Sequence, residues 1–417
     1  MSSSRAFAWI VWLIASIFYA YQYILRVMPN IMMNDIMQQF HIDAAAFGQF
    51  SGVYYLGYSL MHLPVGIMLD RFGPKKVLPL CMLMTVVGLT PLMISDYWLY
   101  PIVGRTLIGM GSSAAILGVF KVIRLTFSEK HFTRMLSFSV AIGLIGAIYG
   151  GGPVDYMVQT MGYQKVIGFF AILGVALAIT TFIIVPPIKK YKSKSIMGDI
   201  KAVFSNKKVM MICLLAGMML GPMEGFADAW GTAFLKENYA LEGLLAASLP
   251  SAIFVGMCFG SPILSLIAEK TNSYFGTIIA SAIIMAVVFY GLLLHLLHVD
   301  YLTVLFMIVG MCCAYQIIAI YKASTYVKEQ LVGLTTAAAN MIIMVFGYLF
   351  HSLIGYIVNA LGGAHDAKAL VWGLVIIPIG LTIGAVGFSY IASHEHKARK
   401  RKTQSLHPIF DAHITPS

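Results

Sequence analysis

The sequence is poor in charged side chains. Only 11% of its 417 residues are Asp, Glu, Lys or Arg, whereas 59% are hydrophobic. A soluble protein usually has about a quarter charged residues, and its interior could not hold this much apolar surface. The shortage of charge therefore excludes an ordinary soluble enzyme and indicates helices that face lipid.

Cysteine is also scarce, and its positions indicate no chemistry. The five cysteines lie inside apolar stretches, and none has the spacing of a metal site or of a disulfide framework. The sequence has no nucleotide-binding loop, metal-ligand cluster or nucleophile–base signature. It therefore predicts no metal, no cofactor and no catalytic residue, and a membrane enzyme or receptor is only a remote alternative.

Long hydrophobic runs are what the chain has in abundance. A helix needs about 20 apolar residues to cross a membrane, and windows of this kind occur about twelve times. The run from Phe7 lacks the features of a cleaved signal peptide and is expected to be the first span. The sequence predicts an all-α membrane protein with spans near 7–30, 47–69, 77–95, 98–124, 134–157, 164–186, 209–234, 246–268, 275–296, 301–324, 334–359 and 369–392.

Lysine and arginine give the chain a formal net charge of +11, and their positions are strongly biased. Only Lys165, Lys236 and Lys368 fall in the loops on one side, and Arg26 and Arg105 lie inside spans. Basic residues concentrate in cytoplasmic loops. We therefore expect both termini in the cytoplasm and the spans in a cell inner membrane. The basic surplus is then a signal of membrane topology, with some attraction to anionic lipid in the bilayer, and it predicts no nucleic-acid partner.

A lysine-rich polar stretch divides the predicted spans into two sets of six. Weak internal repeats support this division, because Gly109 and Gly310 lie 201 positions apart and Pro64 and Pro262 lie 198 apart. Two six-helix halves related by an axis along the membrane normal are typical of transporters, with the substrate bound between them. We expect two pseudo-symmetric six-helix bundles at 1–186 and 209–392, a cytoplasmic linker at 187–208, and a basic, disordered cytoplasmic tail at 393–417.

A charged turn that contains glycine joins predicted spans 2 and 3. Span 4 then carries Arg105, Gly109 and Gly111 in the pattern Arg-x-x-x-Gly-x-Gly. Together with the twelve spans, these two motifs resemble the major facilitator superfamily over the whole chain, although Pro74 stands where a basic residue is usual. The signature residues of the turn are Gly66, Asp70, Arg71, Gly73, Lys75 and Lys76.

The resemblance implies a secondary transporter that works by alternating access, and we expect a monomer. It also implies that the turn latches the cytoplasmic ends of the two halves when the protein faces outward. Asp70 would accept hydrogen bonds from the start of span 11 near Gly333, and Arg71 would pair with Glu129. A charged turn that only sets topology is the alternative.

The residues around the first span resemble a narrower branch of the family. The run YQYILRVMPNIMMNDI at 21–36, with YYLGYSLMHLPVG in span 2 and LGVFK in span 4, resembles bacterial intraphagosomal amino-acid transporters and lysosomal dipeptide transporters. This resemblance implies an amino acid or short peptide as the small-molecule substrate. Neighbouring branches share some of these residues, so an organic-anion or siderophore transporter is the alternative.

Ionisable side chains inside predicted spans each need a partner or a function. Arg26 shares a helix face with Tyr19 and Tyr23. We interpret it as a carboxylate-binding or gating cation, with snorkelling to the outer surface as the alternative. Arg105 lies about 10 Å into span 4, and the resemblance implies that it faces the interior and influences substrate binding or proton coupling.

Glu224 and Asp228 lie one helical turn apart in span 7, after a Gly221–Pro222 pair that is expected to kink the helix. Two such carboxylates do not both ionise easily in a low dielectric, so one is expected to carry a coupling proton. Structural neutralisation of Arg26 and Arg105 is the alternative, and sodium coupling stays open. The resemblance implies that spans 1 and 7 approach each other on the outer side when the cavity opens inward. Since Arg26 and Asp228 lie at equal depth in these two spans, we predict that they meet there as an outer gate, which breaks on opening outward.

Acidic and basic groups in one cavity suit a zwitterion. An arginine would bind its carboxylate, and Glu224 or Asp228 would bind its ammonium group. The sequence therefore predicts proton-coupled symport of an amino acid or short peptide, whereas an organic-anion carrier would not need the acidic pair. The expected polar and aromatic wall residues of the cavity are Tyr54, Tyr55, Tyr149, Trp230, Gln316 and Asn340.

Overall fold

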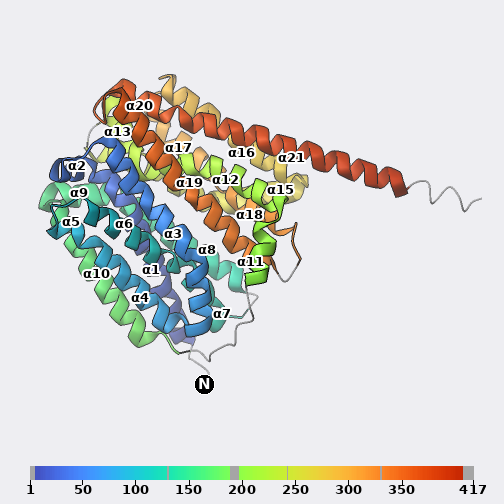
Figure 1. The fold of residues 1–417 in the computed structure, drawn as a ribbon, viewed down its shortest axis with the longest axis horizontal. Coiled ribbons are helices and arrows are strands. Elements are labelled where there is room, and N and C mark those ends of the chain that lie inside the picture. Colours follow the sequence, from blue (N-terminus) through green and yellow to red (C-terminus); the bar gives the residue numbers. More distant parts are fainter. Residues whose placement is uncertain (1–4, 129–130, 188–196, 242, 329–330, 407–417) are drawn as a thin grey trace, which may run out of the picture.

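Helices make up nearly all of the structure. The computed structural model describes residues 5–128, 131–187, 197–241, 243–328 and 331–406, and these ranges contain helices and short connections without a strand. Figure 1 shows the N-terminal helices, blue to green, packed beside the C-terminal helices, yellow to red. The predicted all-α membrane fold is therefore confirmed.

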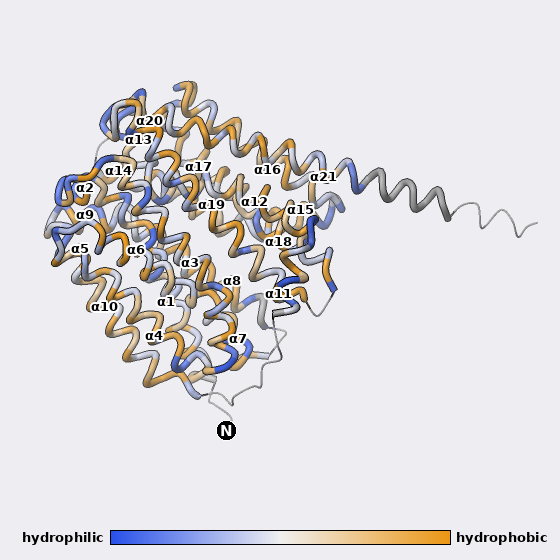
Figure 2. Tube along the Cα trace, viewed as in Figure 1, coloured by the Kyte–Doolittle hydropathy of each residue, from blue (hydrophilic) through white to orange (hydrophobic). Residues whose placement is uncertain are grey.

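Eleven segments among the described residues are long and apolar enough to cross a membrane. They correspond to eleven of the twelve predicted spans. The one remaining predicted span is span 2, which is α3 (Ala44–Phe72), a 29-residue helix. It packs against α6 of its own half and α19 of the other. Because α3 faces other helices, it needs less apolar surface. Figure 2 shows hydrophobic residues along most helix bodies and hydrophilic residues mainly near their ends.

The first half contains six spans, three of which consist of two consecutive helices. A short additional helix, α2, follows the first span. The elements are α1 (Arg5–Ile31), α2 (Met33–Phe40), α3 (Ala44–Phe72), α4 (Pro74–Leu89) with α5 (Pro91–Ile94), α6 (Leu99–Ser112) with α7 (Ala114–Thr126), α8 (Phe132–Tyr149) with α9 (Gly152–Met161), and α10 (Tyr163–Ile184).

The second half begins after a short connecting helix, α11. Its first span contains one turn of π-helix, η2. The elements are α11 (Met197–Phe204), α12 (Lys207–Gly225) with η2 (Phe226–Trp230) and α13 (Gly231–Tyr239), α14 (Gly243–Ser248) with α15 (Ser251–Thr271), α16 (Tyr274–Leu293), α17 (Val299–Cys313) with α18 (Tyr315–Ser324), α19 (Val332–Leu361), and α20 (Ala367–Leu374) with α21 (Ile376–Leu406).

Equivalent helix pairs in the two halves share local features. Span 4 is interrupted at Ser113 and span 10 at Ala314. A Cβ atom added to Gly109 would lie 1.9 Å from a backbone oxygen of α3, and one added to Gly310 would lie 1.8 Å from a backbone oxygen of α15. No side chain fits at such distances, so both glycines are needed for close packing of spans 2 and 4 and of spans 8 and 10. The repeat in the sequence therefore reflects equivalent packing.

The two ends of the bundle differ in charge. We call one end the basic end, because it carries Arg71, Lys75, Lys76, Lys121 and Arg124 near the ends of α3, α4 and α7. The other, called the opposite end, holds the start of α3 and the end of α19. The basic end is the side that the sequence predicts to face the cytoplasm.

Contacts between the halves involve mainly α3 with α19 and α8 with α15. Near the opposite end, a Cβ atom added to Gly48 would lie 2.5 Å from the His351 carbonyl oxygen, and one added to Gly151 would lie 2.3 Å from Ser251 Oγ. At the basic end, a Cβ atom added to Gly333 at the start of α19 would meet no heavy atom within 4 Å. The halves are therefore packed tightly at the opposite end.

The C-terminal tail differs from its prediction. Helix α21 continues to Leu406, so residues 393–406 are helical, although the sequence predicts disorder from 393. This segment contains no glycine or proline and includes alanine, lysine and arginine, which favour helix. Residues 407–417, and 188–196 of the predicted linker, lie outside the described residues.

Candidate substrate and coupling site

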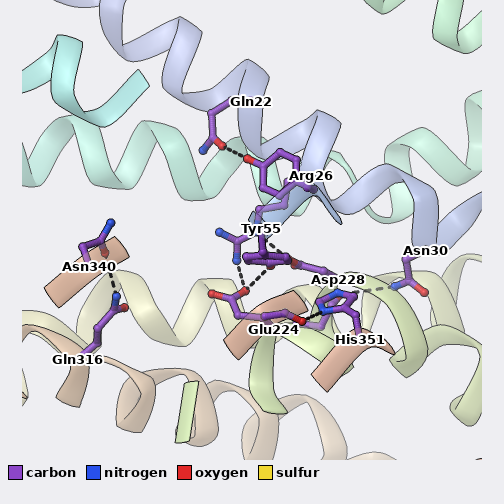
Figure 3. Close-up of polar contacts among 12 residues, drawn as sticks. Gln22, Arg26, Asn30, Tyr55, Glu224, Asp228, Gln316, Asn340 and His351 are labelled. Atoms are coloured by element: carbon purple, nitrogen blue, oxygen red, sulfur yellow. Dashed lines mark hydrogen bonds and ion pairs between the residues drawn. The ribbon is translucent and has the colours of Figure 1, made fainter. Parts of the chain in front are cut away.

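Two arginines and two carboxylates lie buried between spans 1, 4 and 7. The exposed fractions are 6% for Arg26, 2% for Arg105, 5% for Glu224 and 2% for Asp228. Figure 3 shows Arg26 of α1 facing the two carboxylates of span 7. Arg26 is therefore an interior cation in this structure and does not snorkel to the surface.

Arg26 binds both carboxylates of the other half. Its Nε donates to Asp228 Oδ2 at 2.7 Å, and its Nη2 donates to Glu224 Oε2. The guanidinium also lies 4.9 Å from the centre of the Tyr23 ring and 5.2 Å from that of Tyr55. The predicted contact between Arg26 and Asp228 is thus present and joins the two halves. We call Arg26, Glu224, Asp228 and Tyr55 the Arg26 cluster.

Span 7 is irregular at the carboxylates rather than at its proline. Helix α12 continues through Pro222 to Gly225, and the π-helical turn η2 follows and contains Asp228. The helix therefore does not break at Gly221–Pro222 as expected, and the irregular turn lies a few residues later, at Asp228. Single π-helical turns frequently occur at functional sites, and here the turn is where Asp228 meets Arg26.

Tyr55 of α3 connects the two carboxylates. Its hydroxyl group lies 3.1 Å from Glu224 Oε2 and also contacts Asp228 Oδ2. A phenol carries one proton, so these two oxygens share a single donor. A proton on either carboxyl group would give each contact a donor of its own.

Arg105 binds the backbone of span 1 rather than a carboxylate. Its Nη1 donates to the Leu25 carbonyl oxygen at 2.5 Å, and its Nη2 donates to the Arg26 carbonyl oxygen at 2.8 Å. In a regular helix the Leu25 carbonyl would accept from residue 29, but Pro29 has no N–H. Arg105 thus supplies the donor that Pro29 lacks and positions the helix at Arg26.

The remaining predicted residues of span 1 lie beside this cluster. The rings of Tyr19 and Tyr23 are 5.2 Å apart, and Tyr23 faces Phe254 of the second half at 6.3 Å. Gln22 accepts a hydrogen bond from the Tyr54 hydroxyl group at 2.7 Å. The polar and aromatic face of span 1 therefore contacts both halves, the second through Tyr23 and Phe254. Figure 3 shows the hydrogen bond of Gln22 within the first half.

The predicted wall residues divide into separate groups. Gln316 Nε2 donates to Asn340 Oδ1 at 3.2 Å, and Figure 3 shows this pair apart from Arg26. Trp230 is fully buried between the halves, against Gly48. Tyr149 is 41% exposed, and its hydroxyl group lies 3.7 Å from Met157 Sδ of the same span, so its place in the cavity wall stays a prediction.

The signature turn makes contacts within its own half. Gly73, which has a φ of 80°, ends α3 and precedes Pro74 at the start of α4. Asp70 Oδ1 accepts from Lys121 Nζ at 2.7 Å. The Arg71 guanidinium lies over the Phe72 ring. Gly73 adopts the left-handed region, which accounts for a glycine at this position.

The other signature residues are structural or exposed here. Lys75 Nζ donates to the carbonyl oxygens of Phe182 and Val185 at 2.7 and 3.1 Å, where a cation stabilises the C-terminus of α10. Lys76 is exposed, and a Cβ atom on Gly66 would meet only Leu117, at 3.9 Å. Glu129 lies outside the described residues. The latch concerns the outward-facing state and stays a prediction.

Two functional contacts were not predicted from the sequence. Tyr55 was ranked only as a wall residue, since its role depends on how α3 rotates toward span 7. The contact between Lys121 Nζ and Asp70 Oδ1 joins two helices of the first half, and no motif in the sequence pairs these residues. Pro29 is a sequence signal for the contact between Arg105 and span 1. A proline inside a span leaves a carbonyl group without its helical donor, and a side chain of another span can bind it.

The sequence profile of the Major Facilitator Superfamily matches residues 11–350. The chain belongs to the Major Facilitator Superfamily. Membership of this superfamily points to a transporter rather than an enzyme.

Individual relatives are distant. The chain is 20% identical over 224 residues to the nitrite extrusion protein of Bacillus subtilis, covering 52% of this chain and 54% of the relative. It is 27% identical over 266 residues to the uncharacterized transporter YybO of the same organism, covering 55% and 57%. The chain spans about half the length of these relatives.

Similarity in fold extends over the whole chain. A bacterial homolog of the human lysosomal transporter Spinster, in an inward-facing and unoccupied conformation, has a TM-score of 0.74 at 15% identity. The match covers 93% of this chain and 97% of that structure. At this identity the likeness establishes the fold alone.

Proposed function

We propose that this protein transports a small zwitterionic solute, such as an amino acid or short peptide, across a bacterial inner membrane by alternating access and proton-coupled symport. The observation that carries the proposal is the balance of the four buried charges. Arg26 and Arg105 offset Glu224 and Asp228. Arg26 meets both carboxylates where the halves join, and Arg105 is bound to the backbone of span 1 beside it. A zwitterion leaves this balance unchanged, whereas an anion would add a net charge to a low-dielectric site.

The Arg26 cluster suggests how the substrate is bound. Arg26 can donate to a substrate carboxylate, and Glu224 or Asp228 can accept from its ammonium group. A zwitterion could thus replace the ion pairs between Arg26 and the carboxylates with equivalent ion pairs between these side chains and the substrate. Because separation of a buried ion pair without replacement is strongly unfavourable, the halves would separate at the opposite end only when substrate or a proton compensates the charges.

Proton coupling is supported by the contacts of Tyr55. Its single hydroxyl proton serves two carboxyl groups, and a proton on Glu224 or Asp228 would supply the missing hydrogen bond. Such a proton would also weaken the attraction of that carboxyl group for Arg26. Binding a proton on one side of the membrane and releasing it on the other would then couple its movement to that of the substrate.

An organic-anion or siderophore transporter is the second candidate. It is favoured by two buried arginines and by the similarity to a nitrite extrusion protein. Such a carrier would use Arg26 and Arg105 and would not require the carboxylates. We place it second because Arg26 already contacts both carboxylates and Arg105 donates to backbone carbonyl groups.

The test is uptake into proteoliposomes with an imposed pH gradient, using amino acids, dipeptides and small organic acids. We expect accumulation of at least one zwitterion to follow the gradient. Replacing Glu224 and Asp228 with Gln and Asn separates the candidates, since a zwitterion carrier should lose substrate binding and an anion carrier should retain it. A verified substrate whose uptake ignores the pH gradient would exclude proton coupling.

A further inference from the structure

A second set of polar side chains lies between the halves, apart from the buried charges. It consists of His62 on α3, Gln316 on α18 and Asn340 on α19, which we call the His62 group. Gln316 Nε2 donates to Asn340 Oδ1 at 3.2 Å, and Asn340 Nδ2 lies 3.5 Å from His62 Nε2. The group therefore joins one helix of the first half to two helices of the second.

The His62 group has hydrogen-bonding capacity that protein contacts do not use. His62 is 3% exposed, and its Nδ1 has no hydrogen-bond partner among the described residues. Ser59, almost one turn earlier on α3, is 1% exposed, and its Oγ also has no partner there. Buried polar atoms are normally hydrogen-bonded, so these two atoms indicate a site that accepts a polar ligand.

The spacing along α3 relates this group to the Arg26 cluster. His62 follows Tyr55 by two helical turns, which corresponds to roughly 10 Å along the helix axis. Aromatic rings line the interval, because the Tyr58 ring is 5.2 Å from that of His62 and stacks 6.3 Å from that of Tyr54. The distance between the Arg26 cluster and the His62 group therefore matches the length of one small solute.

We propose that the His62 group is a substrate subsite for an uncharged hydrogen-bonding group, such as a carboxamide or a hydroxyl group. The zwitterionic end of the same solute would lie at Arg26, so this inference rests on the proposed function. Asn340 and Gln316 each offer a donor and an acceptor but no charge. A second ionic group would thus meet no counter-charge among these side chains, whereas a carboxamide could bind to several of them.

The experiment compares uptake of L-glutamine and L-methionine by the full chain in proteoliposomes, within a panel of zwitterionic amino acids. The two side chains have similar length, and only glutamine carries a carboxamide. We expect wild-type uptake of glutamine to exceed that of methionine roughly three- to tenfold, because one or two neutral hydrogen bonds stabilise binding by about this factor. Asn340→Leu removes these hydrogen bonds and should reduce the glutamine-to-methionine ratio to about one.

Matched variants separate binding from folding. Asn359→Leu makes the same change at an exposed position of α19 and should keep the wild-type ratio. His62→Gln retains a donor and an acceptor and should preserve a preference for glutamine, whereas His62→Phe should abolish it. If Asn340→Leu fails to fold, this histidine pair decides the question.

An unchanged glutamine-to-methionine ratio in both Asn340→Leu and His62→Phe would overturn the subsite and leave the proposed function intact. Absence of wild-type uptake for every zwitterion in the panel, under either direction of the pH gradient, would overturn the proposed function and this inference together.

Discussion

The Arg26 cluster and the signature turn each pair an acidic residue with a basic one, but in different surroundings. Arg26 and its two carboxylates are almost fully buried and join spans of different halves. Asp70 and Lys121 join spans 2 and 4 of one half, and the Asp70 side chain is 71% exposed. A buried pair is costly to break, whereas an exposed pair contributes little. We infer that the Arg26 cluster holds the halves together, while the turn can exchange partners.

The largest effect is expected from Arg26→Ala. The substitution leaves Glu224 and Asp228 buried without their cation, and breaking such a pair costs about 3–5 kcal/mol. Uptake should be lost, and purified protein should unfold at a clearly lower temperature. Lys76→Ala removes one positive charge from an exposed position and serves as the control. Equal unfolding temperatures for the two variants would contradict the difference between the regions.

Arg105 should rank next, because it supports Arg26 through the backbone. Arg105→Lys cannot reach both carbonyl oxygens, and loss of a charge-assisted hydrogen bond costs about 1.5–3 kcal/mol. Pro29→Ala returns an N–H donor to the Leu25 carbonyl. A double-mutant cycle on unfolding should therefore give a smaller cost for Arg105→Lys in the Pro29→Ala protein. The same cost in both backgrounds would refute the positioning role.

Gly48→Val tests the tight contact at the opposite end. Any Cβ atom there would lie 2.5 Å from the His351 carbonyl oxygen, so the variant should push α3 away from α19. A Ser251→Cys reporter, in a background without the five native cysteines, should then react severalfold faster with an impermeant maleimide. Gly333→Val at the open basic end is the matched control. Equal labelling rates in the two variants would contradict the predicted separation.

Asp70→Asn should have the smallest effect on stability. Its partner Lys121 belongs to the same half, and exposed ion pairs typically contribute about 0–1 kcal/mol. Thermal unfolding should therefore stay close to wild type, and Lys121→Ala should match it. A loss as large as that of Arg26→Ala would mean that the turn, too, holds this state together.

The helices and the central ion pair follow from local sequence. Apolar run length predicts the spans. The equal depth of Arg26 and Asp228 predicts their contact once the family resemblance implies that spans 1 and 7 approach each other. Span α3 was placed correctly although its composition is less apolar than that of the other spans. The position of a span and the depth of a residue within it depend on the order of residues along one helix, which the sequence contains directly.

The contacts of Tyr55, Arg105 and Asp70 could not be predicted from local sequence. Tyr55 meets the carboxylates only through the rotation of α3, and Arg105 finds carbonyl groups on another span. Asp70 pairs with Lys121 rather than with the start of α19 because the halves are packed at the opposite end. These contacts depend on the relative placement of helices and on the conformational state, which local patterns do not determine.

The most direct test of the central claim is uptake by the charge-swapped protein. Arg26→Asp and Asp228→Arg should each abolish uptake, since each places like charges together between spans 1 and 7. The double variant Arg26→Asp/Asp228→Arg restores an opposite pair and should recover part of the lost activity. Recovery would support an ion pair that joins the two halves, whereas a double variant no better than the worse single variant would contradict it.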